Sequence, residues 1–343
     1  MKLLIVTQVI DTDHPILGFF HRWVAEFALH YEHVHVIALQ VGKHDLPANV
    51  TVHSLGKESG ANRLQYLIRF YQLIWQLRPQ YDHVFVHMNQ IYIILGAALW
   101  RAAGKRVGLW YAHGAVTPSL QIAVAGADLV FTSTKQGMRI DTQKRVIVGQ
   151  GIDTAVFTPS PKKPDQRLRL ITVGRVTQSK NLNTLLQACV ILKSKHIPFS
   201  FQIIGPAETP TEQAYLAQMQ TLVQTLDLAA GVAWVGPVTQ AQLPAYLQSA
   251  DVFIHDGSTN SLDKTLIEAS LTGCTVISSN PSYAGLATPY GTDLLFTPHN
   301  PAQLAAIIQT AVNQTPASAQ QMQLYFRVNS SITNLISGIV SRY

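Results

Sequence analysis

The chain has 343 residues, long for one domain and sufficient for two, of which 47% are hydrophobic and 13% are charged. No apolar run approaches the roughly 20 residues that a membrane-spanning helix needs, and the first residues turn polar too early for a signal peptide. The net charge of +6 suits phosphate-bearing ligands or an anionic membrane surface. Because the sequence has no basic run and no aromatic-basic RNA motif, we expect no nucleic acid partner.

The charge is spread along the chain, with 14 lysines and arginines against 10 acidic residues up to position 160 and 11 against 9 after it. The two cysteines, Cys189 and Cys274, lie in apolar segments without the spacing of metal ligands. We therefore expect two buried thiols in a reducing, cytoplasmic setting rather than a disulfide.

Short apolar runs alternate with amphipathic segments, which is typical of βα units around parallel sheets. The first half is predicted to contain strands at residues 2–8, 34–39, 84–88, 107–113 and 129–134, and helices at 19–30, 62–78 and 91–103. Three prolines and two lysines in TPSPKKPDQ, residues 158–166, then indicate a linker. The second half is predicted to contain strands at residues 168–174, 199–205, 232–236, 252–255 and 275–279. The sequence therefore predicts an α/β protein with two doubly wound domains, with ligands beyond the carboxyl ends of strands.

A first candidate anion site lies in VGRVTQSKN, residues 173–181, after the first strand of the second half. Arg175 and Lys180 lie in a short loop there. The strand ends at Gly174, and a helix is predicted to open near Asn181. Two cations beside a helix N-terminus suit phosphate binding, because the free backbone N–H groups also attract anions. The alternative is a solvated loop with two surface cations.

A second candidate site is GSTNSLDKTLIEASLTG, residues 257–273, where a helix is predicted to begin near Asp263. Lys264 and Glu268 are four residues apart and share one helical face. A cation in the first turn opposes the helix dipole, so a bound anion would explain it. The lysine and the free N–H groups suit a diphosphate, and the glutamate suits the diol of a ribose. A modest exposed ion pair is the alternative.

With these motifs the sequence resembles the family 4 glycosyltransferases of the GT-B fold over most of its length. The resemblance rests on the order of VGRVTQSKN, FQIIGPA, WVGPVTQAQLPAYLQSADVFIH and LIEASLTGCTVISS, and on GQGIDTAVFTP at residues 149–159. It implies two Rossmann-like domains facing across a cleft. It also implies an acceptor domain at residues 1–158, a linker at 159–167, a nucleotide-sugar donor domain at 168–325, and a terminal helix at 326–343 that packs back on the first domain.

The resemblance implies that Arg175 and Lys180 bind the donor diphosphate as catalytic residues. Glu268 matches the second glutamate of the family's E-x7-E motif, which binds the ribose. Asn260 replaces the first glutamate, which in the family lies near the transferred sugar. The run Ser261, Leu262, Asp263 and Lys264 resembles a bacterial subset of the family, and we expect it at the donor site, with Lys264 as a third phosphate ligand.

In the first half the resemblance implies two further assignments. Gly18 would lie in a loop near the donor phosphates, and His113, at a strand end, would lie near the transferred sugar as a catalytic residue. His87 and Asn89, at another strand end, are expected on the acceptor side. A lone histidine at a strand end is more often structural, which is the alternative for His113.

The implied reaction is transfer of a sugar, with retention of configuration, from a nucleoside diphosphate sugar to a hydroxyl of a glycan, polysaccharide or lipid-linked acceptor. The resemblance implies no metal and no other cofactor, and we interpret DTD at residues 11–13 as a turn. Two alternatives stay open. One is a phosphorylase-like enzyme acting on a sugar phosphate, and the other is a nucleotide-sugar binding protein without catalysis, which Asn260 would explain.

The segment NRLQYLIRFYQLIWQLRPQ, residues 62–80, is helical, aromatic and basic, a composition found in helices that lie on membranes. One narrow polar stripe is formed by Gln65, Arg69, Gln72 and Gln76, with apolar residues nearly all round, which favours a helix packed on a sheet. We therefore expect a cytoplasmic protein, with peripheral contact to the inner face of the membrane as the alternative.

Overall fold

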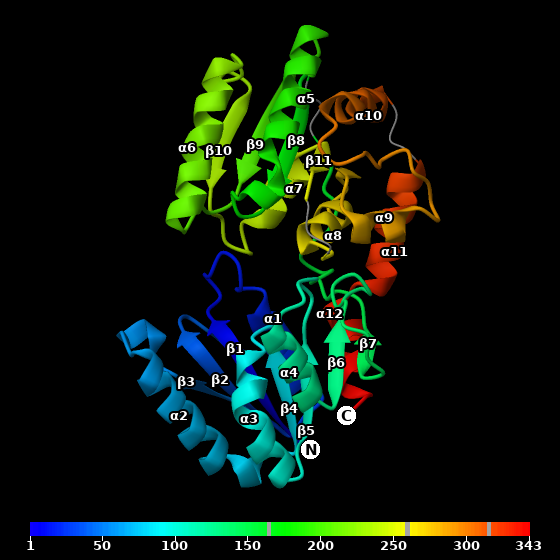
Figure 1. Cartoon of the computed structure of the whole chain (residues 1–343). Helices are drawn as coiled ribbons and strands as arrows, with labels where there is room; N and C mark the ends of the chain where they lie inside the picture. The colour runs from blue at the N-terminus through cyan, green and yellow to red at the C-terminus, as the bar shows by residue number, and fades with distance from the viewer. Residues whose placement is uncertain (163–165, 258–260, 314–316) are drawn as a thin grey trace. The chain divides into compact units, whose positions relative to one another are not determined.

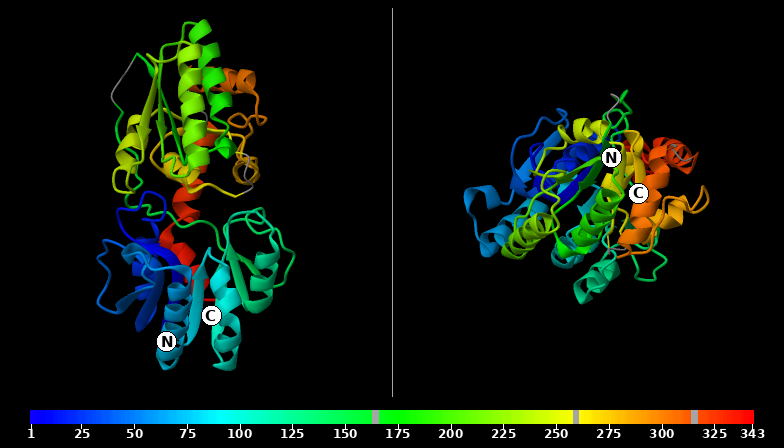
Figure 2. Two further views of the ribbon diagram at one scale, coloured as in Figure 1. Left: turned by 60° about the vertical axis from the view of Figure 1, so that its left-hand side comes forward. Right: turned by 90° about the horizontal axis from the view of Figure 1, so that it is seen from above.

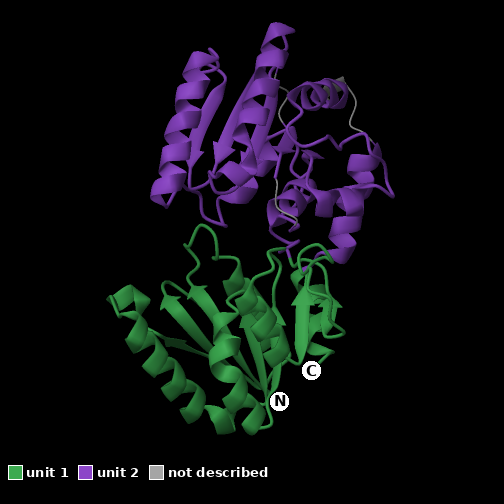
Figure 3. Cartoon of the chain, in the orientation of Figure 1, with its two compact units in different colours: residues 1–151, 332–343 green, residues 152–331 purple. Residues whose placement is uncertain are grey.

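The structure is a computed structural model of the whole chain, and it describes residues 1–162, 166–257, 261–313 and 317–343. The chain forms two compact units, shown in separate colours in Figure 3. Unit 1 consists of residues 1–151 and 332–343, and unit 2 consists of residues 152–331. Each unit has its own parallel sheet, so each is described by itself.

Unit 1 is built on a seven-stranded parallel sheet in the order β3-β2-β1-β4-β5-β6-β7. Its strands are β1 (Lys2–Ile10), β2 (His33–Val41), β3 (Val50–Ser54), β4 (His83–His87), β5 (Arg106–Trp110), β6 (Leu129–Thr132) and β7 (Arg145–Ile147). Sequence analysis missed β3, whose residues alternate with polar ones, and β7, which has only three residues.

Helices cover both faces of this sheet (Figures 1 and 2). They are α1 (Phe20–Ala28), α2 (Arg63–Gln76), α3 (Ile91–Ala102), α4 (Pro118–Gly126) and α12 (Ile332–Val340). Leu3 of β1 lies in one hydrophobic cluster with Phe20 of α1 and Ile336 of α12. Its neighbour Leu4 faces the other way and lies in a cluster with Phe70 of α2. This two-sided cover explains why β1 is a continuous apolar run rather than an alternating one.

Unit 2 is built on a five-stranded parallel sheet in the order β10-β9-β8-β11-β12. Its strands are β8 (Leu168–Val173), β9 (Phe199–Ile204), β10 (Val232–Gly236), β11 (Val252–His255) and β12 (Thr275–Ser278). Its helices are α5 (Leu182–Ser194), α6 (Pro210–Thr225), α7 (Leu243–Ser249), α8 (Lys264–Leu271), α9 (Pro281–Ala287), α10 (Pro301–Asn313) and α11 (Ala317–Asn329). In β11, Ile254 packs in the cluster of α5, α6 and α10, and Phe253 packs in that of α7, α8 and α11.

The chain passes from unit 1 to unit 2 after Gly151, before the expected boundary at residue 158. The amide of Ile152 donates to the carbonyl of Ser330 at 2.7 Å, and the side chain of Phe157 is buried in a hydrophobic cluster of unit 2. These contacts make residues 152–158 part of the second unit. Residues 163–165 of the expected linker lie outside the described residues.

The chain returns to unit 1 at Ile332, later than the expected position 326. Phe326 lies on α11 and is buried in the same cluster as Leu266 of α8, which keeps α11 in unit 2. Helix α12 contacts α1 instead. Residues 332–343 therefore complete unit 1.

In each sheet the strand order reverses once near the middle, between β1 and β4 in unit 1 and between β8 and β11 in unit 2. Such reversals place two loops side by side at the carboxyl ends of the strands, where open α/β sheets bind ligands. The predicted class, α/β with two Rossmann-like doubly wound domains, is confirmed.

Two further expectations can be compared with the structure. Cys189 and Cys274 are both buried and free, and burial raises the pKa of the Cys189 thiol to about 12 and that of Cys274 to about 11. Both thiols are thus protonated and unreactive at neutral pH. Among the described residues, no helix has the length and apolar character that crossing a bilayer requires.

Candidate functional site

The candidate site lies at the strand-order reversal of unit 2, where the loops after β8 and β11 meet. The first loop begins at Gly174, whose φ of +149° is a backbone conformation that favours glycine. A Cβ atom on Gly205, at the end of β9, would lie 1.9 Å from the Gly174 carbonyl oxygen. The two glycines therefore let the ends of β8 and β9 approach each other closely.

The β8 loop continues into a short 3-10 helix, Gln178–Lys180, and then into α5. Between them Asn181 has a φ of +44°, a left-handed conformation that asparagine tolerates better than most residues. Its side-chain amide donates to the carbonyl of Asp256 at 2.9 Å, which ties the β8 loop to the β11 loop. The methylene stem of Lys180 lies against Gly174. Lys180 is thus directed at the neighbouring loop.

The ammonium group of Lys180 forms an ion pair with Asp263, the residue before α8. The same carboxylate lies 2.7 Å from His255 Nε2, at the end of β11, and Lys180 Nζ lies 3.4 Å from that nitrogen. Burial favours the protonated form of Asp263, but Lys180 and His255 outweigh it and hold the pKa of this carboxyl well below its usual range. Asp263 is therefore a carboxylate at neutral pH.

The protonation of His255 follows from its other partners. The amide of Gly257 donates to His255 Nδ1 at 3.3 Å, so this nitrogen is an acceptor and the proton lies on Nε2, facing Asp263. The ring is almost completely buried, and burial together with Lys180 lowers its pKa. A Cβ on Gly257 would lie 2.3 Å from the ring, so only glycine fits there. His255 is a neutral donor that orients Asp263.

A second ion pair lies on α8. Lys264 Nζ is 4.0 Å from Glu268 Oε1, and the same oxygen accepts a hydrogen bond of 3.1 Å from Gln240 Nε2. Burial lowers the pKa of Lys264 to about 8, against the attraction of Glu268. Burial raises the pKa of Glu268, although Lys264 and Gln240 oppose the shift. Each charge is costly without its partner.

Arg175 is held apart from these two pairs by a contact with α6. Its Nη1 lies 3.4 Å from Glu212 Oε1, and the Arg175 side chain is 53% exposed. The other carboxylate oxygen of Glu212 accepts the amides of Glu208 and Thr209 at 2.9 and 3.1 Å. The hydrogen bond from the Thr209 amide is the largest cause that lowers the pKa of Glu212, and the Glu208 amide and Arg175 lower it further. Arg175 is therefore an accessible cation at the same edge of the sheet.

The remaining predicted donor residues have different surroundings. Leu262 is buried in a hydrophobic cluster with α8, so it supports the loop and is not a polar ligand. Ser261 is also buried, and its carbonyl accepts a hydrogen bond of 3.0 Å from Asn280 Nδ2. Asn260 lies outside the described residues. The structure brings together Lys180 with Asp263, and Lys264 with Glu268.

The predicted residues of unit 1 divide into buried and exposed positions. His87 is buried, with its ring stacked 3.9 Å from that of Phe20 and its Nδ1 3.3 Å from Thr7 Oγ1. The structure thus places His87, which was expected on the acceptor side, in the packed core of unit 1. Asn89 follows Met88, which has a φ of +62°, and the Asn89 amide donates to the His87 carbonyl at 2.7 Å.

His113 is exposed after β5, with its amide bonded to the carbonyl of Gly137 at 3.1 Å. A Cβ on Gly18 would lie 2.7 Å from the carbonyl oxygen of His14, so the loop needs glycine for its own backbone packing. The DTD segment forms the expected turn, in which the amide of Asp13 donates to Asp11 Oδ1 at 3.0 Å. No group of three or more metal-binding side chains is found in the described part of the chain.

Sequence analysis missed three side chains that shape the site: His255, Glu212 and Gln240. His255 was detectable as the last residue of a predicted strand. Glu212 was detectable as the third residue after Thr209 in a capping box, the pairing of a helix cap with the residue three positions on. Gln240 comes from the loop after β10 and meets Glu268 only through the tertiary fold, so no local signal points to it.

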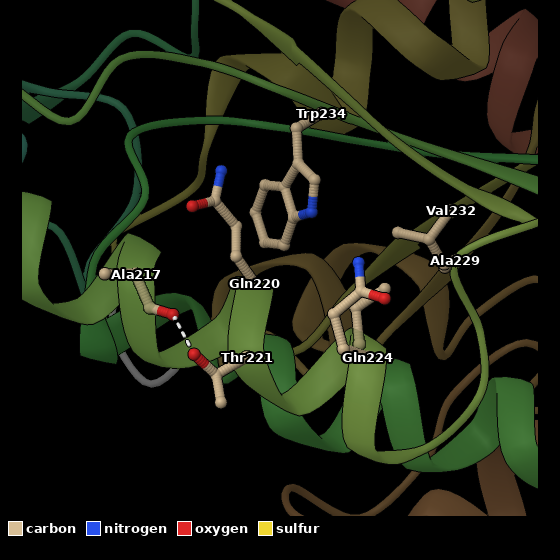
Figure 4. Close-up of a pocket in the computed structure, with 8 residues that line it drawn as sticks. Ala217, Gln220, Thr221, Gln224, Ala229, Val232 and Trp234 are labelled. Carbon is tan, nitrogen blue, oxygen red and sulfur yellow. Dashed lines mark hydrogen bonds between the residues drawn. The ribbon is translucent and has the colours of Figure 1, made fainter.

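A different hollow in unit 2 lies between α6 and the edge strand β10 (Figure 4). Its lining residues are Ala217, Gln220, Thr221, Val223, Gln224, Ala229, Val232 and Trp234. None of these side chains is charged, so the hollow offers no cation to a phosphate. Strand β10 is at the edge of the sheet, and β9 separates it from β8. The candidate donor site is therefore the charged edge at β8 and β11.

The sequence model of the family described as glycosyl transferases group 1 matches residues 153–326. This segment is half of the chain and coincides with nearly all of unit 2. The chain therefore belongs to the glycosyl transferases group 1 family.

Named relatives cover different shares of the chain. The amylovoran biosynthesis glycosyltransferase AmsK of Erwinia amylovora is 30% identical over 168 residues, which are 47% of this chain and 40% of that protein. A D-inositol 3-phosphate glycosyltransferase of Kineococcus radiotolerans is 25% identical over 310 residues, 80% of this chain and 70% of that protein. The matched segments span 36% to 42% of the length of the first three curated relatives.

Solved structures resemble the whole chain. The HepE protein of Anabaena, in complex with UDP, has a TM-score of 0.78 at 18% identity, covering 100% of this chain and 99% of that one. Sucrose-phosphate synthase from Thermosynechococcus elongatus has a TM-score of 0.80 at 16% identity, covering 100% and 98%. At these identities the likeness shows the fold, which is the GT-B type with two Rossmann-like domains.

Proposed function

We propose that the protein is a retaining glycosyltransferase that moves a sugar from a nucleoside diphosphate sugar to an acceptor hydroxyl. The observation that carries the proposal is the pair of lysines, Lys180 and Lys264, held by carboxylates beside the N-terminus of α8. This edge of the sheet offers positive charge and backbone N–H groups to a diphosphate. Membership of the glycosyl transferases group 1 family supports the same reaction.

In the proposed mechanism the diphosphate leaves as the bond to the anomeric carbon breaks. Negative charge then builds on the departing phosphate oxygens, so cations fixed nearby stabilise the transition state more than the ground state. Lys180 would supply this charge by leaving Asp263 for the phosphate, while His255 keeps Asp263 satisfied. Arg175 is exposed enough to approach the same anion. The chain's own cations would perform this step, and a metal ion is not part of the proposal.

Glu268 is the proposed ligand of the ribose hydroxyls. Its carboxylate is nearly buried, with only 2% of the side chain exposed, and already has Lys264 and Gln240 as partners. A carboxylate can accept several hydrogen bonds, so a diol can be added to these contacts. HepE in complex with UDP-glucose, a structural neighbour, supports a uridine nucleotide as the first donor to test. His113 and Asn260 remain proposed residues of the sugar side.

The acceptor is proposed to be a growing glycan, either free or lipid-linked. The name of AmsK refers to amylovoran biosynthesis, and this relative supports a polysaccharide product. A reducing, cytoplasmic setting belongs to the same proposal and is supported by the two free, buried cysteines. These assignments depend on relatives that the chain matches over part of their length.

The proposal is tested by calorimetric titration of the purified protein with UDP-glucose, GDP-mannose and UDP alone, followed by a donor-hydrolysis assay without acceptor. We expect the protein to bind one of the sugar nucleotides and to release free sugar slowly. Proton NMR should show that the anomer released first has the same configuration as the donor sugar. Release of sugar 1-phosphate in the presence of orthophosphate would instead identify a phosphorylase. Tight binding with no turnover by any donor and acceptor would identify a binding protein.

A further inference from the structure

The hollow between α6 and β10 of unit 2 combines an aromatic ring with uncharged hydrogen-bonding groups. Its volume is about 520 Å³, within the range of roughly 300 to 1,000 Å³ that is typical of small-molecule sites. Figure 4 shows the Trp234 ring extending from β10 toward α6, and the side chains of Gln220 and Gln224 extending from α6 toward that ring. The hollow therefore has one flat apolar surface with amides beside it.

The polar groups of the hollow have hydrogen-bonding capacity to spare. Within the described ranges, no protein group bonds to Trp234 Nε1 or to the side-chain amides of Gln220 and Gln224. An indole N–H only donates, whereas an amide side chain both donates and accepts. A sugar hydroxyl also does both, and the C–H groups of a sugar ring pack well on an aromatic face, which carries partial negative charge. The combination therefore suits a pyranose.

The surrounding sequence is poor in charge. Residues 197–250, which include β9, α6, β10 and α7, contain no lysine or arginine, three acidic residues and eight glutamines. A phosphate, a nucleic acid or an acidic glycan would find no cation among these residues to pair with. The ligand that fits this part of unit 2 is therefore a neutral one.

The edge strand itself is unsuited to pairing with a strand of another chain. Strand β10 has five residues, and its register with β9 shifts between Trp234 and Gly236. Gly236 has a φ of +81°, and the next residue, Pro237, has no backbone N–H. Short edge strands with a bulge or a proline oppose edge-to-edge pairing. The binding surface is therefore made by side chains rather than by the strand backbone.

The hollow is separate from the candidate donor site. Helix α6 begins beside that site, where Glu212 contacts Arg175. Gln220 and Gln224 come eight and twelve residues after Glu212, a distance of about 12 to 18 Å along the helix axis. A ligand in the hollow therefore leaves room for a nucleotide at the donor site.

We propose that the hollow is a non-catalytic subsite for a neutral oligosaccharide, with one sugar ring stacked on Trp234 and its hydroxyls bonded to Gln220 and Gln224. The identity of this glycan rests on the proposed function: it is a part of the acceptor or product chain away from the reacting end. Binding there would raise the concentration of acceptor ends close to the protein.

Native affinity electrophoresis tests the subsite without any sugar nucleotide, in gels that contain dextran, soluble galactomannan or soluble arabinoxylan. We expect at least one of these neutral polymers to retard the parent protein, and retardation by none of them would overturn the proposal. A parent protein that binds a sugar nucleotide but no neutral polymer would contradict the subsite alone. One that is retarded but binds no sugar nucleotide would contradict the proposed function alone.

Variants separate the hollow from the rest of the surface. Trp234→Ala should lose the retardation, and the control Trp75→Ala should keep it, because Trp75 is a 56% exposed tryptophan on α2. Since Trp234 also packs against the core, a second variant avoids that contact: Gln220→Ala with Gln224→Ala should bind the polymer at least fivefold more weakly. Its control is Gln213→Ala, at an exposed position of α6 outside the hollow. Retardation that persists in both hollow variants would contradict the proposal.

Tryptophan fluorescence gives a direct readout. All five tryptophans lie in the described ranges, and Trp23, Trp100 and Trp110 are only 1%, 1% and 3% exposed. In the variant Trp75→Phe, quenching by acrylamide therefore reports mainly on Trp234, and a bound glycan should lower the quenching constant. Unchanged quenching with a polymer that retards the protein would contradict stacking on Trp234. A dimer in light scattering that Trp234→Ala abolishes would assign the hollow to self-association instead.

Discussion

The carboxylate of Asp263 joins two strand ends of unit 2: its Oδ2 lies 2.7 Å from His255 Nε2 and also contacts the ammonium group of Lys180. His255 ends β11, and Lys180 follows β8. The two strands are neighbours at the reversal of strand order. When no ligand is bound, the ammonium group of Lys180 is therefore held in place by the Asp263 carboxylate, which the neutral imidazole of His255 orients in turn.

Replacing Lys180 by methionine should remove the cation while keeping the length of the side chain. We expect binding of the sugar nucleotide to weaken at least tenfold, because a charge-assisted contact to phosphate is lost. The control is Lys193→Met on α5, a more exposed lysine away from the strand-order reversal, and it should bind as the parent does. Calorimetric titration measures both, and equal affinities in the two variants would contradict the assignment of Lys180.

Replacing Asp263 by asparagine should reveal a stability contribution that depends on pH. The pKa of Asp263 is depressed in the folded state, so its contribution is present above the unfolded value near 3.9 and is lost as the pH falls toward the folded pKa. We expect Asp263→Asn to lower the free energy of unfolding by about 2 kcal/mol at pH 7.

Urea unfolding at pH 7, 5, 4 and 3 should show the difference between the parent and Asp263→Asn shrinking below about pH 4. A difference that stays constant down to pH 3 would contradict the depressed pKa. In the Lys180→Met background the effect of Asp263→Asn should be smaller at every pH, because the two residues are coupled.

Replacing Lys264 by methionine should raise the pKa of Glu268 further, because its cationic partner in a buried position is removed. We expect Glu268 to become protonated closer to neutral pH, and sugar-nucleotide binding to weaken more steeply as the pH falls than in the parent. Titrations between pH 5 and pH 8 measure this slope. The double variant Lys264→Met with Glu268→Gln should lose the added pH dependence, and a slope that persists in it would have another source.

Replacing Gly205 by alanine tests the close approach of two strand ends. Its φ is +144°, and the new Cβ would lie 1.9 Å from the carbonyl oxygen of Gly174. Gly236 also has a positive φ, +81°, but nothing lies within 4 Å of a Cβ there. Gly236→Ala should cost about 1 kcal/mol from its backbone conformation alone, and Gly205→Ala should cost clearly more. Equal shifts in thermal melting would contradict the steric argument.

A histidine pair in unit 1 should make that unit sensitive to acid. His35 of β2 has its Nδ1 3.3 Å from His53 Nε2 of β3, and burial, with the nearby His33, His53 and Lys2, lowers the pKa of His35 to about 4. The folded state then binds fewer protons than the unfolded state between about pH 6.5 and pH 4. The contribution of His35 to stability is therefore lost as the pH falls through this window.

The variant His35→Gln should reduce this loss by about 2 kcal/mol when unfolding is compared at pH 7 and pH 4. His30→Gln is the matched control, because His30 is exposed after α1. The free energies of unfolding of His35→Gln and His30→Gln should differ at pH 4 but not at pH 7. Equal acid sensitivity of the parent and both variants would show that other groups govern the transition.

The sequence was most informative where a property repeats along the chain. Runs such as Leu3 to Val6 predicted buried parallel strands, and the sequence predicted Lys180 in the loop after a strand and Lys264 in the first turn of a helix. Contacts between residues far apart in the sequence could not be predicted. Nothing local shows that Asp263 meets His255, or that Leu262 turns into the core while its neighbours stay polar.

The sequence also did not show which face of a helix packs against the sheet. In α2 the apolar residues occupy two arcs, and the sequence alone cannot show which of them the sheet covers. Phe70 and Ile74 are buried because they lie above β2 and its neighbours, whereas Leu64 and Trp75 extend past that cover. Edge strands such as β3 were missed for a related reason, since their half-exposed residues carry little apolar signal.

The return of the chain at Ile332 determines when unit 1 can be completed. Ile332, Leu335, Ile336 and Ile339 fill the same hydrophobic cluster as Phe20 and Trp23, more than 300 positions earlier. A ribosome that has released the first 151 residues has therefore produced a sheet with one face partly uncovered, and all of unit 2 must be synthesised before α12 can cover it. A nascent chain stalled before residue 332 would therefore expose part of the apolar face of this sheet to chaperones or proteases.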